Sequence, residues 1–250
     1  MRPRTEKPLP SNTLFISDLH LCAERPAVTE LFLQFLQYQA TQSKALYILG
    51  DLFEAWIGDD DTDAEHARII AGLRQLTGQG VELFLMHGNR DFLIGSNFAQ
   101  TTGCRLLPDE CVIDLYGEPT LLMHGDTLCT QDTEYQALRT QIRNTDWQQA
   151  FLAKPLSQRA ALARQYRAES QEKTRQKADY IMDVDQHAVE ATMRRHQVTR
   201  LIHGHTHRPA VHEFSMNGRP AQRIVLGDWY EQGSSLQCST HGCYLTELPL

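Results

Sequence analysis

Seven side chains that can bind metal ions follow short apolar runs in this sequence. They are Asp18, His20, Asp51, Asn89, His124, His205 and His207. Oxygen and imidazole ligands without thiolate suit manganese, iron or zinc, and they argue against calcium or a cysteine-type zinc site. Seven ligands are too many for one ion with an open position. The set therefore predicts two ions that share a bridging carboxylate.

Each ligand group has a simpler interpretation when it is taken alone. Asp-x-His near a strand end is often a turn or a helix cap, and Gly-Asp is a common turn. His205 and His207 are harder to explain in this way, because residues two apart at a strand end face the same side. The occurrence of all the groups in one chain favours a metal site.

The apolar runs predict the elements that must position these ligands. They cover residues 14–20, 45–51, 81–89, 120–126 and 198–205, and runs of this length bounded by Gly and Asp are typical of buried strands. Helical patterns separate the first three runs. One begins at Pro26, and the other covers residues 64–76. Strand–helix–strand alternation predicts parallel pairing, with the ligands meeting beyond the carboxyl ends of the strands.

The rest of the chain predicts antiparallel strands and a helical insertion. Residues 116–119 and 217–220 read as hairpin turns, because each contains Gly followed by a polar residue and Pro. Residues 132–180 are rich in Gln, Ala and Arg and show no strand pattern. We expect an α/β fold with one domain over residues 1–250, carrying three or four inserted helices at about 132–180.

Composition excludes several classes of protein. With 250 residues, 41% of them hydrophobic, the chain can bury a core without staples, which excludes disordered and fibrous classes. It contains no apolar run of about 18 residues, and its amino end shows no signal-peptide pattern. We therefore expect a cytoplasmic protein whose six cysteines are reduced. The alternatives at residues 238–243 are a zinc site built on Cys238, His241 and Cys243, or a glycine-containing turn.

Charge is unevenly distributed along the chain. The net charge is −7, yet residues 139–177 contain nine basic and three acidic residues. An acidic protein is a poor general nucleic-acid binder, whereas a local basic segment suits a phosphate group or an anionic membrane surface. The alternative is a solvated helix surface, which is usual for runs of charge.

The order of the ligand groups resembles the calcineurin-like metallophosphoesterases. Their pattern is Asp-x-His, Gly-Asp, Gly-Asn-His, His and Gly-His-x-His, and the matching blocks extend from Asp18 to His207. The resemblance implies two packed mixed β-sheets flanked by helices around a two-metal site. It implies that Asp51 bridges the ions, and it divides the remaining ligands between them. One ion would take Asp18, His20 and His207, and the other Asn89, His124 and His205.

One position departs from the family pattern. Where many members have Gly-Asn-His, this chain has Gly88-Asn89-Arg90. Arg90 cannot donate its proton at ordinary pH, but it can pair with phosphate oxygens. This suits a leaving group that needs no acid, such as a phosphate monoester, whose second pKa is about 6. Cleavage of a pyrophosphate is therefore favoured over release of an alcohol. The alternative for Arg90 is a structural ion pair.

The match is closest to the members of this family that hydrolyse UDP-2,3-diacylglucosamine in lipid A biosynthesis. It rests on the motifs around Asp18–Cys22, Gly50–Asp61, His87–Leu93, Met123–Cys129, Ile181–Val184 and Ile202–Pro209. The resemblance implies attack of metal-activated water on the uridine-side phosphorus, giving UMP and 2,3-diacylglucosamine 1-phosphate (lipid X). It also implies two Mn²⁺ ions and peripheral association with the cytoplasmic face of the inner membrane. We expect no obligatory protein partner.

The same resemblance implies a set of reacting and substrate-binding residues. Asn89, Arg90 and His205 would stabilise charge during the reaction. The substrate would contact Asn89, Arg90, Asp132, Ser170, Thr174, Lys177 and His205. Thr174 stands where the family commonly has Asn. Ser170, Thr174 and Lys177 share one helical face by their spacing.

The apolar residues of the insertion have two possible uses. Trp147, Phe151, Leu152, Leu156, Leu162 and Tyr166 can pack the inserted helices against the body, or line a chamber for acyl chains, as the resemblance implies. Two other functions compete with the hydrolase. One is a nuclease or phosphodiesterase with the same metal centre, and the other is a scaffold without catalysis. The acidic body and apolar insertion argue against the first, and the intact ligand set argues against the second.

Overall fold

The computed structural model describes residues 12–176 and 183–250. Its strands are β1 (Thr13–Ile16), β2 (Ala45–Leu49), β3 (Glu82–Met86), β4 (Arg105–Leu107), β5 (Glu110–Leu115), β6 (Glu118–Met123), β7 (Arg200–His203), β8 (Ala210–Met216), β9 (Arg219–Val225), β10 (Gly233–Ser239) and β11 (Gly242–Leu248). Its α-helices are α1 (Pro26–Tyr38), α2 (Ala64–Gly78), α3 (Ser96–Thr102), α4 (Thr133–Ile142), α5 (Thr145–Leu152), α6 (Leu156–Gln176) and α7 (Gln186–Arg195). Two short 3₁₀ helices, η1 (Ala40–Gln42) and η2 (Asp126–Leu128), complete the described elements.

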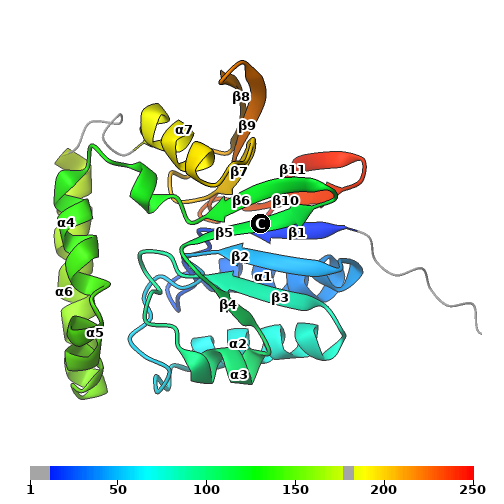
Figure 1. Cartoon of the computed structure of the whole chain (residues 1–250). Helices are drawn as coiled ribbons and strands as arrows, with labels where there is room; N and C mark the ends of the chain where they lie inside the picture. The colour runs from blue at the N-terminus through cyan, green and yellow to red at the C-terminus, as the bar shows by residue number, and fades with distance from the viewer. Residues whose placement is uncertain (1–11, 177–182) are drawn as a thin grey trace, which may run out of the picture.

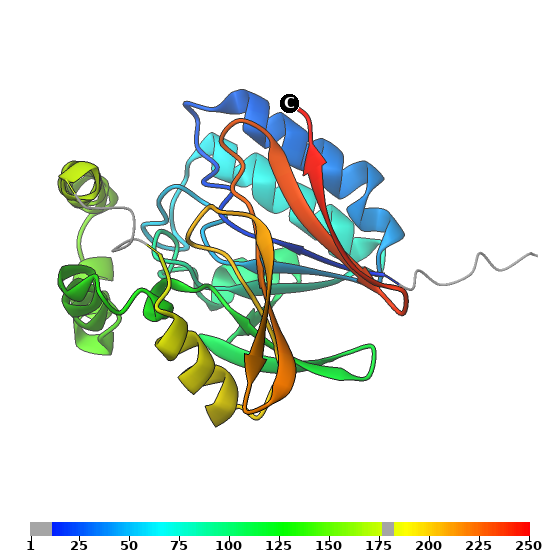
Figure 2. The same cartoon turned by 90° about the horizontal axis from the view of Figure 1, so that it is seen from above.

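The strands form two mixed sheets that lie face to face (Figures 1 and 2). The first has the order β11-β10-β1-β2-β3-β4, and the second has the order β5-β6-β7-β9-β8. Strands β1 to β4 pair in parallel, as do β6, β7 and β9. The predicted α/β fold, with parallel strands joined by helices and two packed mixed sheets, is confirmed.

Alternation of side chains along the strands produces the layers. In β1, Leu14 and Ile16 face the cluster formed with α1 and α2, while Phe15 faces the second sheet. In β7, Ile202 faces the first sheet, while Leu201 faces the cluster formed with α7. Successive residues of a strand point to opposite faces, so strands buried on both faces read as continuous apolar runs. This explains why these strands were evident in the sequence.

Two predicted hairpin turns are present, each with a loop of two residues. Tyr116 and Gly117 connect β5 to β6, and Asn217 and Gly218 connect β8 to β9. All four residues have positive φ, from 53° to 90°. That conformation matches the twist of the flanking strands, and Gly and Asn adopt it at low cost.

The cysteine pair near the carboxyl end corrects an expectation. Cys238 and Cys243 lie opposite each other on β10 and β11, and a disulfide joins them. The expectation that all six cysteines are reduced is therefore wrong for this pair, and the alternative zinc site loses two ligands. The hairpin brings the two Cα atoms to 4.1 Å. The disulfide requires that Cys238 and Cys243 lie opposite each other on paired strands, and the spacing of the cysteines in the sequence did not reveal this pairing.

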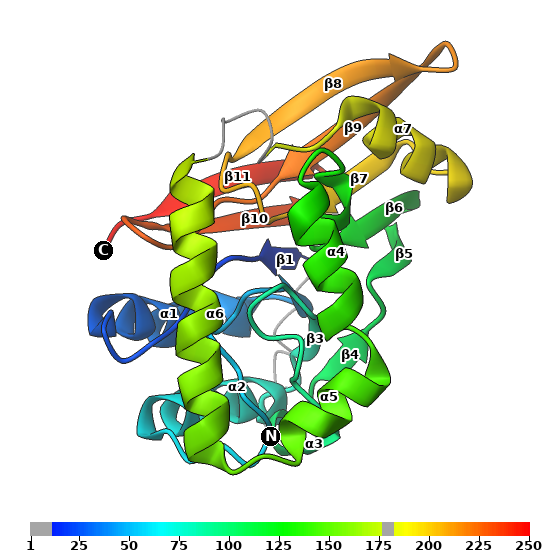
Figure 3. The same ribbon diagram turned by 90° about the vertical axis from the view of Figure 1, so that its left-hand side faces the viewer.

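Three inserted helices stand across one end of the two sheets. Figures 1 and 3 show α4, α5 and α6 together in front of the ends of the strands. Asp132 begins α4 by accepting a hydrogen bond from the backbone of Tyr135, and Asn144 begins α5 in a similar way. The far part of the predicted insertion, residues 177–180, lies outside the described residues. None of the described helices is both long and apolar enough to cross a membrane.

We expect the core between the sheets to control stability. Ile202 is fully buried there, so Ile202→Ala should lower the free energy of unfolding by about 2–5 kcal/mol through lost burial and a residual cavity. Val211 in β8 is 47% exposed, and Val211→Ala is the matched control with an expected loss below about 0.5 kcal/mol. Equilibrium denaturation with urea measures both. Equal losses in the two variants would contradict the layered core.

Candidate metal centre

The ends of five strands deliver the seven predicted metal ligands. Asp18 and His20 follow β1, Asp51 follows β2, and Asn89 follows β3. In the second sheet His124 follows β6, and His205 and His207 follow β7. Because the sheets pack face to face with these strand ends side by side, residues up to 189 positions apart in the chain meet, as the contact of His207 with Asp18 demonstrates.

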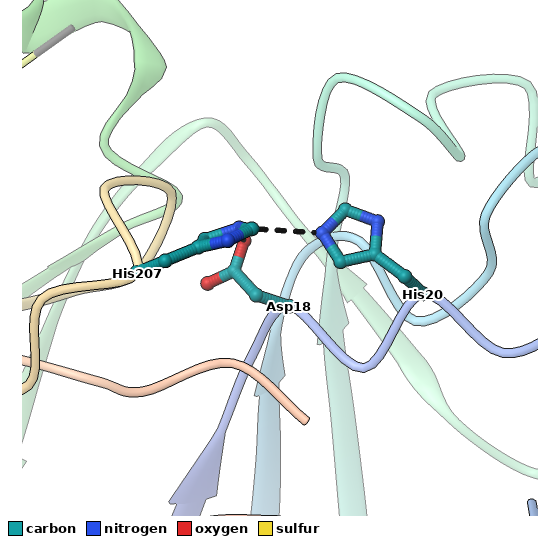
Figure 4. Close-up of side chains that lie close together, drawn as sticks. All are labelled: Asp18, His20 and His207. Carbon is teal, nitrogen blue, oxygen red and sulfur yellow. Dashed lines mark hydrogen bonds and ion pairs between the residues drawn. The ribbon is translucent and has the colours of Figure 1, made fainter. Parts of the chain in front are cut away.

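The first group of ligands consists of Asp18, His20 and His207 (Figure 4). His20 Nε2 lies 3.3 Å from His207 Nε2, and His207 Nε2 lies 3.4 Å from Asp18 Oδ1. These ligand atoms all lie within 4.8 Å of one another. One cation could therefore contact all three side chains.

The second group lies on the other side of Asp51. His124 Nε2 is 2.9 Å from Asn89 Oδ1, and His205 Nδ1 is 3.0 Å from the same oxygen. Asp51 Oδ2 lies 3.7 Å from His124 Nε2 and 3.8 Å from His20 Nε2. This single oxygen thus stands between the two groups, where a bridging ligand is needed.

Two of the imidazoles are oriented through their second ring nitrogen. His124 Nδ1 donates to the carbonyl oxygen of Leu49 at 2.9 Å, and His207 Nδ1 lies 3.0 Å from Asp228 Oδ2. Such partners fix the ring and leave Nε2 for a metal. Asp228 received no role from the sequence. A signal was present, because Gly227-Asp228 follows the apolar end of β9 in the same way that Gly50-Asp51 follows β2.

Each carboxylate uses one oxygen to hold a neighbouring loop. Asp18 Oδ2 accepts hydrogen bonds from the backbone N–H of His205 at 2.8 Å and from Ser17 Oγ at 2.6 Å. Asp51 Oδ1 accepts from the backbone N–H of Arg90 at 2.8 Å. The other oxygen of Asp18 is buried, makes no hydrogen bond within the described residues, and lies 3.4 Å from His207 Nε2. A buried carboxylate oxygen with only this long contact is costly, and a cation would satisfy it.

The backbone is left-handed at most of the candidate ligands. The φ angle is 56° at Asp18, 51° at His20, 54° at Asp51, 70° at His205 and 55° at His207. Residues other than glycine rarely adopt this conformation, and clusters of such residues are typical of functional sites. Nothing in the sequence patterns indicated this strain.

Electrostatics also favour a bound cation. Burial raises the pKa of Asp51 to about 7, with a further contribution from the neighbouring carboxylates Asp91 and Asp18. Burial alone would lower the pKa of His207, but the carboxylates of Asp18 and Asp228 beside it raise that pKa to about 10. Negative charge is therefore concentrated in a dry site. Divalent ions would neutralise it, and the oxygen and nitrogen donors fit such ions.

A hollow of about 460 Å³ opens over these ligands and continues between α4 and α6. Its walls include five of the predicted substrate-binding residues, Asn89, Arg90, Asp132, Ser170 and His205. Thr174 lies on α6, but its side chain is outside the described part of the structure. Lys177 lies outside the described residues altogether. The hollow therefore brings together body and insertion residues that are distant in sequence.

Glu54 is a charged contact of the site that the sequence analysis did not identify. This carboxylate is 4% exposed, and it lies 3.2 Å from Arg25 Nη2 and 3.1 Å from Arg167 Nη2. It is also 4.0 Å from Arg90 Nε and 3.8 Å from His20 Nδ1. Glu54 therefore connects α6 to the predicted phosphate-binding arginine. Glu54 belongs to the segment Gly-Asp-Leu-Phe-Glu, in which the sequence interpretation gave a role only to Asp51.

The inserted helices are held to the body by ion pairs. Arg139 donates to Asp126 Oδ2 at 2.7 Å and to Asp109 Oδ2 at 2.6 Å. Arg159 is 3% exposed in its side chain and pairs with Asp60. With Arg167 on Glu54, these contacts show that much of the basic segment faces carboxylates of the body. Lys154 and Arg164 are exposed instead.

Some apolar residues of the insertion pack against the body, and others are open to a ligand. Trp147 stacks on Phe151, and both belong with Leu162 to the cluster around α1 and α2. Leu152 and Tyr166 are 39% and 40% exposed, and Tyr166 lines the hollow over the metal ligands. The first three residues therefore pack the insertion, and Tyr166 remains available to a ligand.

Comparisons with known proteins agree on one family. The sequence profile of the calcineurin-like phosphoesterases matches residues 11–209. A protein of Pseudomonas paraeruginosa named UDP-2,3-diacylglucosamine hydrolase is 56% identical, covering 96% of this chain and 100% of that protein. Proteins with the same name are 55% identical in Cellvibrio japonicus and 52% identical in Serratia proteamaculans. They cover 94% and 95% of this chain, and 98% and 99% of their own lengths.

We expect divalent metal to stabilise the fold through the candidate centre. Mn²⁺ added to chelator-treated protein at about 100 times its dissociation constant should stabilise the folded state by about 2.7 kcal/mol per independent site. Asp51→Asn should remove most of this gain, because the bridging charge is lost. Asp146→Asn, at an exposed position on α5, is the matched control and should keep it. Melting temperatures with and without Mn²⁺ measure the effect. A full gain in Asp51→Asn would contradict the assignment.

Proposed function

The chain belongs to the calcineurin-like phosphoesterase family, and from this premise we propose that it hydrolyses UDP-2,3-diacylglucosamine to UMP and 2,3-diacylglucosamine 1-phosphate. The reaction is a step in lipid A biosynthesis. The observation that best supports this proposal is that the seven oxygen and nitrogen ligands converge under a hollow whose walls include the inserted helices. Relatives that are 52–56% identical over nearly the whole chain, and that carry the name of this hydrolase, support the substrate.

We assign two Mn²⁺ ions to the centre. Asp18, His20 and His207 would hold one ion, and Asn89, His124 and His205 would hold the other, with Asp51 between them. The absence of thiolate from this set favours manganese over a cysteine-type zinc site. When bound, such ions lower the pKa of water and neutralise charge on phosphate oxygens.

The side chains around the metals account for the rest of the chemistry. Water attacks the uridine-side phosphorus, a new P–O bond forms to its oxygen while its proton passes to the solvent, and the anhydride P–O bond breaks. The electron pair leaves with the sugar phosphate, which needs no proton donor because its second pKa is about 6. Arg90, lining the hollow, pairs with the phosphate oxygens as their charge grows, and Asn89 and His205 fix the reacting phosphorus beside it.

The lipid part of the substrate fits the insertion. Tyr166 and Leu138 are 40% and 38% exposed and line the hollow from α6 and α4, with Ser170 nearby. We place the glucosamine and the start of its acyl chains here. Burial of each methylene contributes about 0.8 kcal/mol, so the acyl chains would provide much of the affinity. By the family resemblance, Asp132 and Thr174 are assigned to the substrate as well, and Lys177 is assigned to its phosphate.

We further propose that the protein associates peripherally with the cytoplasmic face of the inner membrane. The substrate carries two acyl chains, so the enzyme must reach it at a bilayer surface. Exposed Lys154 and Arg164 on the insertion support attraction to anionic lipids. Four arginines of the same segment instead pair with carboxylates of the body, namely Arg139, Arg143, Arg159 and Arg167.

Hydrolysis in ¹⁸O-labelled water tests the reaction. Purified protein with Mn²⁺ and UDP-2,3-diacylglucosamine should place the label in UMP, and chelator should abolish turnover.

His124→Ala should lower kcat by at least about a thousandfold, because Nε2 of His124 is an assigned ligand. His241→Ala, in the turn between β10 and β11, is the matched control with unchanged activity. Label in the lipid phosphate would overturn the assigned site of attack. A preference for generic phosphodiesters would favour the nuclease alternative.

We expect Glu54 to act by positioning Arg90. Glu54→Gln keeps the shape of the side chain but removes the charge that faces three arginines, so kcat/KM should fall about tenfold to a hundredfold, or about 1.4–2.7 kcal/mol. Glu54→Asp should recover part of the loss. Glu213→Gln, at an exposed position on β8, is the matched control. Steady-state kinetics and circular dichroism separate this loss from unfolding. Unchanged kinetics in Glu54→Gln would remove Glu54 from the site.

A further inference from the structure

A second hollow, of about 220 Å³, adjoins the hollow over the metal ligands. Thr206 and Arg208 line both, so the two hollows meet at the loop that carries His205 and His207. The other walls of the second hollow include Asp183, Arg223 and the small apolar residues Pro209 and Ala210. The proposed reaction has given this hollow no use.

Arg223 is a buried cation in the wall of this second hollow. Its residue is 7% exposed, and its Nη1 donates to His203 Nε2 at 3.2 Å. His203 in turn donates from Nδ1 to the carbonyl oxygen of Gly204 at 2.8 Å. Because Nδ1 of His203 carries the proton, its Nε2 is free to accept the hydrogen bond from Arg223. The guanidinium is thereby fixed in one position.

Two polar atoms in the walls lack a hydrogen-bond partner among the described residues. They are Arg223 Nε and Thr206 Oγ1, and both are buried. An unsatisfied buried donor costs about 1–3 kcal/mol, so such atoms need an explanation. A bound group with hydrogen-bond acceptors would satisfy both. Asp183, whose Oδ2 pairs with Arg208 at 2.9 Å, offers an acceptor for a donor on the same group.

We propose that the second hollow binds the uracil ring of the substrate, an inference that rests on the proposed function. Uracil is a single flat ring with two carbonyl acceptors and one N–H donor, which complements Arg223, Thr206 and Asp183. Its flat faces suit the apolar walls at Pro209 and Ala210. A free phosphate is a poorer match, because it would face the carboxylate of Asp183.

The direction of the substrate supports this placement. The lipid phosphate and sugar extend from the metal ligands toward α4 and α6 in the proposed reaction. The nucleoside is attached to the other side of the attacked phosphorus, so it must leave the metal ligands by a different route. The second hollow provides that route, because it begins at Thr206, between His205 and His207.

Replacing uracil by cytosine tests the inference. Cytosine replaces one carbonyl by an amino group and the ring N–H by an acceptor, so it mismatches Arg223 and Asp183. The protein should hydrolyse UDP-2,3-diacylglucosamine at least about tenfold more efficiently than its CDP counterpart, measured as the ratio of kcat/KM values. Arg223→Gln should reduce this ratio about tenfold, and Thr206→Val about threefold. Arg219→Gln, at an exposed position on the same strand β9, is the matched control and should not change it.

The outcomes separate the two proposals. If the unaltered protein does not hydrolyse the UDP substrate, the proposed function fails. If it does, but shows no preference for uracil, or if both variants keep the full preference, the uracil assignment is overturned. If Arg223→Gln does not fold, the preference for uracil measured in Thr206→Val tests the assignment alone. Calorimetry with UMP and with inorganic phosphate completes the test. An equal loss of affinity for both probes in Arg223→Gln would identify a phosphate site and overturn the uracil assignment.

Discussion

The candidate site depends on hydrogen bonds that two of its carboxylates, Asp18 and Asp51, accept from backbone N–H groups. Asp18 Oδ2 accepts from the backbone of His205, which joins a strand end of one sheet to a strand end of the other. Asp51 Oδ1 accepts from the backbone of Arg90, which joins neighbouring strand ends within the first sheet. Both contacts require glycine nearby. A Cβ at Gly204 would lie 2.3 Å from Asp18 Oδ2, and one at Gly88 would lie 2.0 Å from Asp51 Oδ1. The same groups that would bind metal therefore also set the spacing of the loops.

Charge has a second role away from the candidate metal centre. The basic insertion lies against an acidic body, and Arg139, Arg159 and Arg167 reach carboxylates that belong to loops of that body. Arg167 contacts Glu54, which in turn faces Arg90 and His20. Partly buried pairs of this kind are costly to break, because one charge is left without a partner. The uneven charge of the sequence thus serves first to seat the helices that wall the hollow. In the proposed function, Lys154 and Arg164, which are exposed, would attract lipid phosphate.

The sequence predicted those features that depend on local pattern. Strands buried on both faces produced apolar runs, and the ligands followed them directly, so β1, β2, β3, β6 and β7 and the residues after them were evident. Features that depend on pairing between distant segments were not. The Cys238–Cys243 disulfide needs the register of β10 and β11, and Asp228 gains its meaning only when His207 lies beside it. Glu54 and Arg223 are ordinary charged residues in the sequence. Their burial, which gives them a role, follows from tertiary packing alone.

The left-handed backbone at Asp18, His20, Asp51, His205 and His207 has a consequence for how this protein could be improved. Each such residue costs about 1–2 kcal/mol relative to a relaxed conformation, so the five together form a large reserve of unfavourable energy in a small volume. Glycine at any of them would relieve strain and remove a candidate ligand at the same time. Selecting variants for thermal stability alone would therefore favour substitutions that inactivate the protein. Stability and turnover compete at the same five backbone positions.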